Sequence, residues 1–260
     1  MKIWIQSAAP SSNDPRWIPY KESLSAQLNK AKRESTHIEV HGVNYGHKLM
    51  DYSSYVRFLS KGQIIENAIS AEKEGFDGFS MSNTLDIDLG FYEIRNVVSI
   101  PVAFLAENSL HIACILANKF SVLCWNKALS VIADRTIRQY GLSEKFIPAE
   151  TFDITEDEAL EGFRDATSIV ERVKDISNKV IASGAGILVP FCNIMNVLLH
   201  SVGLTEIEGV PILNTTAMIV KGIEFLVELD QIGIKRSESG FYSALAKDDL
   251  VSVRKAFALE

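Results

Sequence analysis

Short apolar runs alternate along the chain with longer stretches in which apolar positions recur at the spacing of a helix. The short runs predict strands over Lys2–Gln6, His37–His41, Gly78–Met81, Pro101–Leu105, Phe120–Cys124, Ile187–Phe191 and Pro211–Leu213. The longer stretches predict helices over Tyr20–Arg33, Gln63–Lys73, Asp86–Val98, Glu107–Ala117, Leu129–Tyr140, Thr155–Asn178 and Thr216–Leu229. This alternation favours an α/β fold with parallel sheets and right-handed crossovers.

Two of the predicted strand ends repeat along the chain. Gly75–Asn83 (GFDGFSMSN) and Gly184–Cys192 (GAGILVPFC) both run from a glycine through a strand-like segment to a polar residue. In the same way, Ile100-Pro101-Val102 is answered later in the chain by Val210-Pro211-Ile212. The numbering offset is nearly the same for both pairs, at 109 (192 minus 83) and 110 (211 minus 101). This nearly constant offset indicates a duplicated α/β unit.

The second of these ends carries the clearest chemistry. Cys192 and Asn193 follow the apolar run Ile187–Phe191, and the helical pattern that includes Ile194 begins at once. Unpaired amides at the start of a helix favour an anion, either a thiolate or a substrate carboxylate or enolate. Open parallel sheets bind ligands at this edge. The alternative is a small apolar cysteine that fills a core, and we interpret Cys114 and Cys124 in that way.

Composition narrows the function classes. The chain has 260 residues, a net charge of −7 and no basic run, so a nucleic-acid partner is not expected. Three cysteines without a CxxC motif indicate a reducing compartment. We find no signal peptide and no apolar run of membrane-spanning length, which together predict a cytoplasmic protein without a membrane partner.

Three histidines, His37, His41 and His47, lack the cysteines or carboxylates that would complete a metal site, and we predict no metal. The aromatic-rich segment Gly46–Ser60 is a candidate lid, with a surface-packed connection as the alternative. Gln6, Ser7 and Ser11 come at the end of the first predicted strand, where they could face a ligand, although a solvated loop is favoured for Ser11.

With these features in view, the first 230 or so residues resemble the aspartate/glutamate/hydantoin racemase superfamily, nearest its hydantoin racemase branch. Three passages carry the resemblance: the Cys192 junction, Ile100–Val122 (IPVAFLAENSLHIACILANKFSV) and Asn83–Arg95 (NTLDIDLGFYEIR), in which Asp86, Leu89 and Arg95 match the family pattern. The resemblance implies an enzyme without a cofactor that acts on a small carbon acid such as a hydantoin, an amino acid or a related carboxylate. In that family two cysteines move protons on opposite faces of the substrate.

The resemblance also implies an architecture of two pseudo-symmetric parallel-sheet lobes, with helices on both faces and a cleft between them. The first lobe would span 1–116 and the second lobe 117–214, with a helix over 215–232 that crosses back onto the first. We interpret the segment 233–260 as an extension packed on the surface, at a subunit contact of a homo-oligomer.

The sequence departs from the family at the first cysteine, where Asn83 stands, or Ser82 in an alternative register. Neither side chain is a good base, because an amide does not titrate and a serine hydroxyl needs a partner. Three hypotheses follow: a racemase-type enzyme that uses Cys192, a decarboxylase of the arylmalonate type with one thiol, or a non-catalytic ligand-binding relative.

The remaining candidates would bind substrate. Asn83, Thr84 and Asn193 are suited to hydrogen-bonding a carboxylate, carbonyl or enolate oxygen. The family places a polar substrate-binding residue where Gln6 lies. Hydroxyls of Thr215 and Thr216 would bind ligand oxygens, unless Thr215 only caps its helix. Glu107 would orient a proton donor, unless it is simply an acid in a first helical turn.

Overall fold

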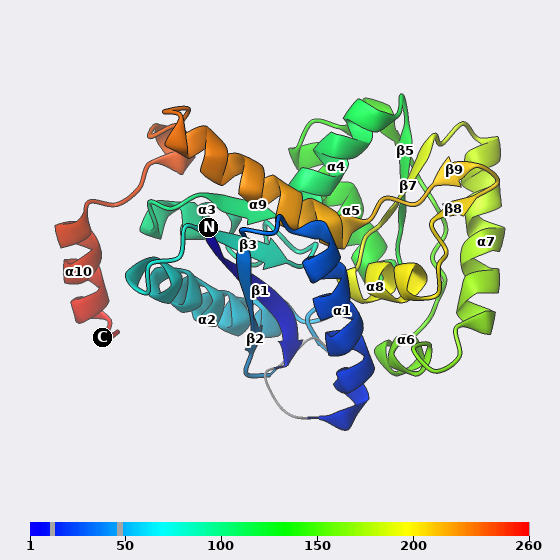
Figure 1. Ribbon diagram of the computed structural model, residues 1–260, viewed down its shortest axis with the longest axis horizontal. Helices are drawn as coiled ribbons and strands as arrows, with labels where there is room; N and C mark the ends of the chain where they lie inside the picture. The colour runs from blue at the N-terminus through cyan, green and yellow to red at the C-terminus, as the bar shows by residue number, and fades with distance from the viewer. Residues whose placement is uncertain (11–13, 46–48, 260) are drawn as a thin grey trace.

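The first half of the chain forms a four-stranded parallel sheet. The computed structural model describes residues 1–10, 14–45 and 49–259. The sheet has the order β2-β1-β3-β4, with bounds β1 Lys2–Pro10, β2 His37–Val43, β3 Gly78–Ser82 and β4 Val102–Phe104. Figure 1 shows this sheet in the left half of the molecule. The first strand therefore continues to Pro10, beyond its predicted end at Gln6.

The second half of the chain builds a smaller parallel sheet of the same kind. Its order is β6-β5-β7, with bounds β5 Phe120–Leu123, β6 Phe146–Ile147 and β7 Ile187–Pro190. A parallel bridge between Leu188 and Ile212 extends it in the position that β4 has in the first sheet. A two-stranded antiparallel ribbon, β8 Glu206–Ile207 and β9 Val210–Pro211, leads into that bridge.

The pairing of strands in the two sheets shows the same repeat that the sequence predicts. Ile3 lies opposite Gly78 in the first sheet, and Phe120 lies opposite Ile187 in the second. The numbers of these β3 and β7 partners differ by 109 (187 minus 78), which is also the offset of the two junctions. The chain forms two pseudo-symmetric α/β lobes built from matching strands.

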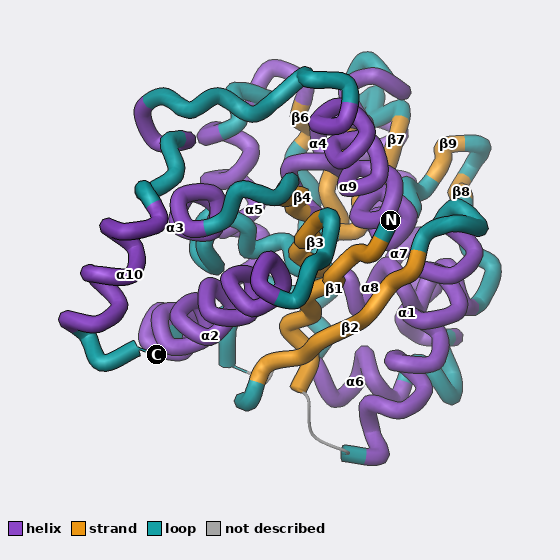
Figure 2. The backbone as a smooth tube through the Cα atoms, turned by 60° about the vertical axis from the view of Figure 1, so that its left-hand side comes forward, coloured by secondary structure: helices purple, strands orange, loops and turns teal. Residues whose placement is uncertain are grey.

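Helices cover both faces of these sheets. The helices of the first half are α1 Ile18–Ala31, α2 Ser54–Lys73, α3 Phe91–Val97 and α4 Leu105–Leu116. Those of the second half are α5 Lys127–Gln139, α6 Glu156–Glu161, α7 Thr167–Ala182, α8 Asn193–Ser201, α9 Thr215–Gln231 and α10 Lys247–Ala256. In Figure 2, α2 lies to the left of strands β1 and β2, and α10 stands beyond α2 at the left edge of the molecule.

Helix α9 joins the halves by packing on the first sheet, against β3 and β4. Its apolar face forms a separate buried cluster with side chains of the first sheet, among them Ile3, Ile5 and Ala103. The contact is close at Gly78, because a Cβ atom there would lie 2.8 Å from the side chain of Ile223. Figure 1 shows α9 running from the second lobe across the first. The division of the chain at residues 116 and 214 stays a prediction.

Several predicted elements have other bounds in the structure. The helix expected over Gln63–Lys73 begins at Ser54, inside the candidate lid, and the helix expected over Asp86–Val98 begins at Phe91. The long helix expected over Thr155–Asn178 is two helices, α6 and α7, with a turn at Gly162–Ala166 between them. Asp165 starts α7 by accepting hydrogen bonds from the amide and hydroxyl of Thr167. The polar tail contains a helix, α10, that the pattern did not reveal. Among the described residues, no helix has both the length and the apolar character needed to cross a membrane.

Candidate active site

Cys192 lies at the carboxyl end of β7, where the chain enters α8. The residue has extended backbone angles and serves as the N-cap of the helix, with only 3% of its surface exposed. Asn193, the first residue of α8, is buried beside it. The strand–cysteine–helix arrangement predicted from the sequence is therefore present, and it places the thiol next to the free amides of a helix start.

The carboxyl end of β3 faces this junction from the other lobe. Asn193 donates from Nδ2 to the Ser82 hydroxyl over 2.8 Å. Thr84 donates from its hydroxyl to the carbonyl of Phe191 over 3.2 Å. The two residues that flank Cys192 are thus each bonded to a residue that flanks Asn83. The structure thus brings the Cys192 junction together with Ser82–Thr84 of the other lobe.

Asn83 is the predicted counterpart of Cys192 in the first lobe, with Ser82 as the alternative. Gln6 of β1 lies opposite Met81, and Leu123 of β5 lies opposite Pro190. Asn83 comes two residues after Met81, and Cys192 comes two residues after Pro190. If Gln6 and Leu123 are equivalent positions of the two lobes, this register favours Asn83 over Ser82 as the counterpart of Cys192, which stays a prediction. The Asn83 side chain accepts a hydrogen bond from the amide of Leu85 over 2.7 Å, which fixes its orientation.

A second layer of polar groups holds Asn193 in place. Its Oδ1 atom accepts from the hydroxyl of Thr216 over 2.9 Å, and the same hydroxyl accepts from Asn196 Nδ2 over 2.8 Å. The amide of Thr215 donates to Asn196 Oδ1 over 2.8 Å. Asn214, not Thr215, is the N-cap of α9. Thr215 and Thr216 therefore support the site from behind.

The expected cleft between the lobes is narrowed to a small cavity. Its volume is about 10 Å³, roughly the space of a single water molecule. The lining residues come from both lobes and are Ser7, Ala8, Ala9, Trp17, Tyr20, Ser82, Asn83, Asn193 and Ile194. Cys192 itself is buried next to this wall and does not line it. A cavity of this volume is too small for a molecule of amino-acid size.

Burial controls the charge of Cys192. Removal from water raises the pKa of its thiol to about 12, and the nearby Asp51 carboxylate adds to the increase. The amides of Met195 and Ile194 act in the opposite direction, because they stabilise the thiolate. In this closed arrangement the thiol is protonated near neutral pH and holds a proton that it can donate.

Asp51 is a buried acid that the sequence analysis did not single out. Its Oδ2 atom accepts from Trp125 Nε1 over 2.7 Å and from Asn126 Nδ2 over 2.8 Å, both at the carboxyl end of β5. The other oxygen, Oδ1, is buried and has no hydrogen-bond partner among the described residues. The contact ties the segment after β2 to the second lobe, which no local sequence signal indicates.

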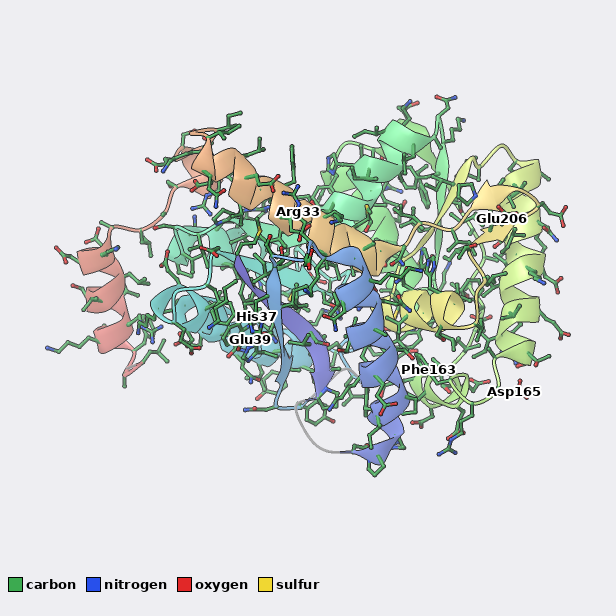
Figure 3. All side chains as sticks on the ribbon, viewed as in Figure 1. Arg33, His37, Glu39, Phe163, Asp165 and Glu206 are labelled. Atoms are coloured by element: carbon green, nitrogen blue, oxygen red, sulfur yellow. The ribbon has the colours of Figure 1, made fainter. Side chains whose placement is uncertain are left out.

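Tyr20 is a second residue that the sequence left unassigned. It comes from α1, and its hydroxyl accepts from Asn193 Nδ2 over 3.3 Å. Burial raises the pKa of Tyr20, so the phenol stays neutral. Its ring packs edge-on against Phe163 of the second lobe, and Figure 3 shows Phe163 beside the lower part of α1. The two lobes therefore also meet along α1.

Five predicted substrate-binding residues lie outside the cavity wall, namely Gln6, Thr84, Glu107, Thr215 and Thr216. Gln6 is fully buried. Its side-chain Nε2 atom donates to the backbone carbonyls of Ser7, His41 and Gly42, and its Oε1 atom accepts from Asn67. Glu107 accepts from Arg95 over 2.7 Å. Ser7 does line the cavity, and its hydroxyl accepts from the amide of Ala9.

The histidines considered as metal ligands lie on the edge strand β2. His37 and His41 each lie within 4 Å of Glu39, at 3.3 Å and 3.7 Å, and Figure 3 labels His37 and Glu39 next to each other. Over residues 1–10, 14–45 and 49–259, no three acidic, histidine or cysteine side chains gather as metal ligands would. Ser11, His47 and the start of the candidate lid at Gly46 lie outside the described residues.

Comparison with known proteins identifies the family. The model of the Asp/Glu/hydantoin racemase family matches residues 20–223. The chain belongs to this family. It is 24% identical over 212 residues to a hydantoin racemase from Pseudomonas sp. strain NS671, a match that covers 79% of each chain. Membership confirms the predicted superfamily and places the chain among racemase-type enzymes.

Solved structures confirm the fold. Allantoin racemase from Klebsiella pneumoniae superposes with a TM-score of 0.75 at 19% identity, covering 95% of this chain and 94% of the other. Glutamate racemase from Campylobacter jejuni subsp. jejuni superposes with a TM-score of 0.60 at 11% identity, covering 99% and 98%. This chain therefore has the same fold as these two solved structures.

Proposed function

We propose that this protein moves a proton at a carbon next to a carbonyl group of a small carbon acid, with Cys192 as the acid/base and no cofactor. The observation that carries the proposal is the position of Cys192, at a helix start facing Ser82–Thr84 of the other lobe. The family and its hydantoin racemase relative support a hydantoin, an amino acid or a related carboxylate as the substrate class.

The surrounding groups suit an enolate intermediate. Amides of Ile194 and Met195 point to the thiol and favour negative charge. The Ser82 hydroxyl and the amide group of Asn83 line the opposite wall, where a carbonyl or carboxylate oxygen of the substrate would lie. Fixed donors stabilise a developing oxyanion most strongly where water is excluded. A buried, protonated thiol then supplies the proton to carbon.

The amide side chain of Asn83 determines whether a second base is present opposite Cys192. An amide has no proton to exchange near neutral pH, so it cannot act as the second base. We therefore assign one face of the substrate to Cys192 and the other to water in the cavity between the lobes. Racemisation by this route is expected to be slower than with two thiols, because water is a weak and poorly oriented base.

A decarboxylase with one thiol is the second candidate, and the same asparagine favours it. Loss of carbon dioxide from a substituted malonate leaves an enediolate, and a single thiol then protonates one face. No base is needed on the other face. The third candidate is a non-catalytic relative that binds the ligand without turnover.

Deuterium separates these candidates. The protein is incubated in D2O with hydantoins, amino acids and α-substituted malonates, and products are followed by chirality, Cα–H signals and carbon dioxide release. A racemase exchanges the Cα–H of either enantiomer, whereas a decarboxylase places one deuteron in the product with a fixed configuration. Ligand binding without exchange or carbon dioxide release, unchanged in Cys192→Ala, would rule out catalysis at the thiol.

A further inference from the structure

A second cavity lies at the opposite edge of the first sheet. It has a volume of about 300 Å³ and is bounded by the amino end of β4, the end of α9 and the segment that follows α9. Residues 99–102, which line this cavity, lie at the amino end of β4. Cys192 instead lies at the carboxyl end of a strand, β7. The two cavities are therefore distinct, and this one is large enough for a small organic molecule.

Two arginines give this cavity its chemistry. Arg95 is 5% exposed, and its Nη2 atom donates to Glu107 and to the carbonyl of Val102. Its Nη1 atom is buried without a hydrogen-bond partner among the described residues, although Arg95 lines the cavity. A guanidinium nitrogen in this condition is costly, because its protons have lost water without gaining an acceptor.

Arg236, from the segment after α9, lies close enough to Arg95 to feel its charge. It donates from Nη2 to the carbonyl of Val98 over 3.1 Å, and both burial and Arg95 lower its pKa. Two guanidinium groups that repel each other at a shared cavity wall are stabilised by an anion between them.

The acids nearby offset this repulsion only in part. Glu238 and Glu72 act to raise the pKa of Arg236, but burial, the largest cause, and the charge of Arg95 outweigh them. Glu107 accepts from Arg95 at Nη2 and not at Nη1, and Asp230 pairs with Lys235 at 4.0 Å. Glu72 accepts from the amides of Ser99 and Ile100. Glu238, which also lines the cavity, is exposed to water.

The rest of the wall is apolar. It is formed by side chains that include Ile100, Pro101, Leu226, Leu229 and Ile234, with the Tyr242 ring lying 5.5 Å from the Arg95 guanidinium carbon. Such a wall favours a ligand with a hydrocarbon body and one charged end. A carboxylate matches the planar fork of an arginine, which can donate two parallel hydrogen bonds to it.

We propose that this cavity is a binding site for a small organic carboxylate with an apolar body, whose charged end lies between Arg95 and Arg236. The site is independent of the proposed catalytic chemistry at Cys192. It depends on the C-terminal segment, because Arg236 and Tyr242 both belong to it.

Calorimetric titration of the full-length protein with 3-phenylpropionate tests the site. We expect saturable binding with one molecule per chain, and no binding of the uncharged 3-phenylpropan-1-ol. Arg236→Gln should weaken binding about tenfold or more, the loss typical for a charge-assisted hydrogen bond. Arg138→Gln, which removes an equal charge from exposed α5, and Cys192→Ala should both leave the affinity unchanged.

Several results would overturn the proposal. They are the absence of saturable binding, equal affinity for the alcohol, and equal affinity in Arg236→Gln. Binding lost in Cys192→Ala would assign the ligand to the other cavity. Inorganic phosphate that binds as tightly as 3-phenylpropionate would show that the apolar wall contributes nothing. Arg95→Lys is a second variant that keeps the buried charge but not the paired donors, and it should also weaken binding.

Discussion

The strand ends of the two lobes match in position and differ in chemistry. After β7 the chain enters α8 at once, and Cys192 is the cap of that helix. After β3 the chain instead makes turns before α3 begins at Phe91, and Asn83 is the predicted counterpart of Cys192 there. Only the second lobe combines a thiol with helix amides that can stabilise its anion. A duplicated scaffold has thus kept its geometry, while a thiol stands at only one of these two strand ends.

Removing the thiol from the second lobe is expected to have the largest effect. Cys192→Ala should lower turnover by about 10²–10⁴-fold, the range typical for loss of a positioned acid or base. Steady-state kinetics with the substrate found in the deuterium screen measures the effect. Circular dichroism should be unchanged, since Cys192 makes few polar contacts. Retention of full activity in a folded Cys192→Ala protein would exclude catalysis at this residue.

The second test places a thiol in the first lobe, so that both strand ends carry a cysteine. Asn83→Cys should increase the rate of Cα–H exchange by about tenfold or more, because a thiol is a far better base than water. Ser82→Cys is the matched control, since the strand register favours residue 83 as the counterpart of Cys192. A gain in Ser82→Cys, with none in Asn83→Cys, would show that the register argument is wrong.

Breaking the contact between the two strand ends should lower stability. Asn193→Ala removes hydrogen bonds with Ser82, Tyr20 and Thr216 and leaves their buried hydroxyls with fewer partners. We expect the free energy of unfolding to fall by about 1–3 kcal/mol in urea titrations. Asn29→Ala, at an exposed position of α1, should change it little. Equal stability of both variants would indicate that the contact between the lobes contributes nothing.

The smallest expected effect concerns the charge next to the thiol. The Asp51 carboxylate raises the pKa of Cys192 because a second negative charge nearby is unfavourable. Asp51→Asn should therefore lower that pKa, so that more thiolate is present at any pH below it. Alkylation of Cys192 by iodoacetamide should then be faster at a fixed pH.

Peptide mass spectrometry can follow this alkylation in a Cys114→Ser background, which removes the more exposed thiol. Asp175→Asn, on the exposed face of α7, deletes the same charge at a distance and serves as the control. A slower reaction in Asp51→Asn than in this control would contradict the assigned direction.

The sequence by itself determined most of the strands, most of the helices and the repeat, because these depend on local apolar spacing. The short strands β6 and β8 were not predicted. Gly184–Asn193 reads as a strand that ends in a cysteine whatever surrounds it, and Asn83 was found by a constant offset. The break between α6 and α7 and the helix α10 were missed, because α6 has only six residues and α10 is a polar helix in which Arg254 is the one buried residue among those the structure describes.

Only the tertiary structure decided how the two strand ends meet. Ser82 and Asn193 are 111 residues apart in the chain, yet they share a hydrogen bond of 2.8 Å. Asp51 and Trp125 meet across 74 residues, and Arg95 and Arg236 come together only because the segment after α9 packs beside β4. Such contacts depend on how complete lobes pack, and a run of residues carries no trace of a partner so far along the chain.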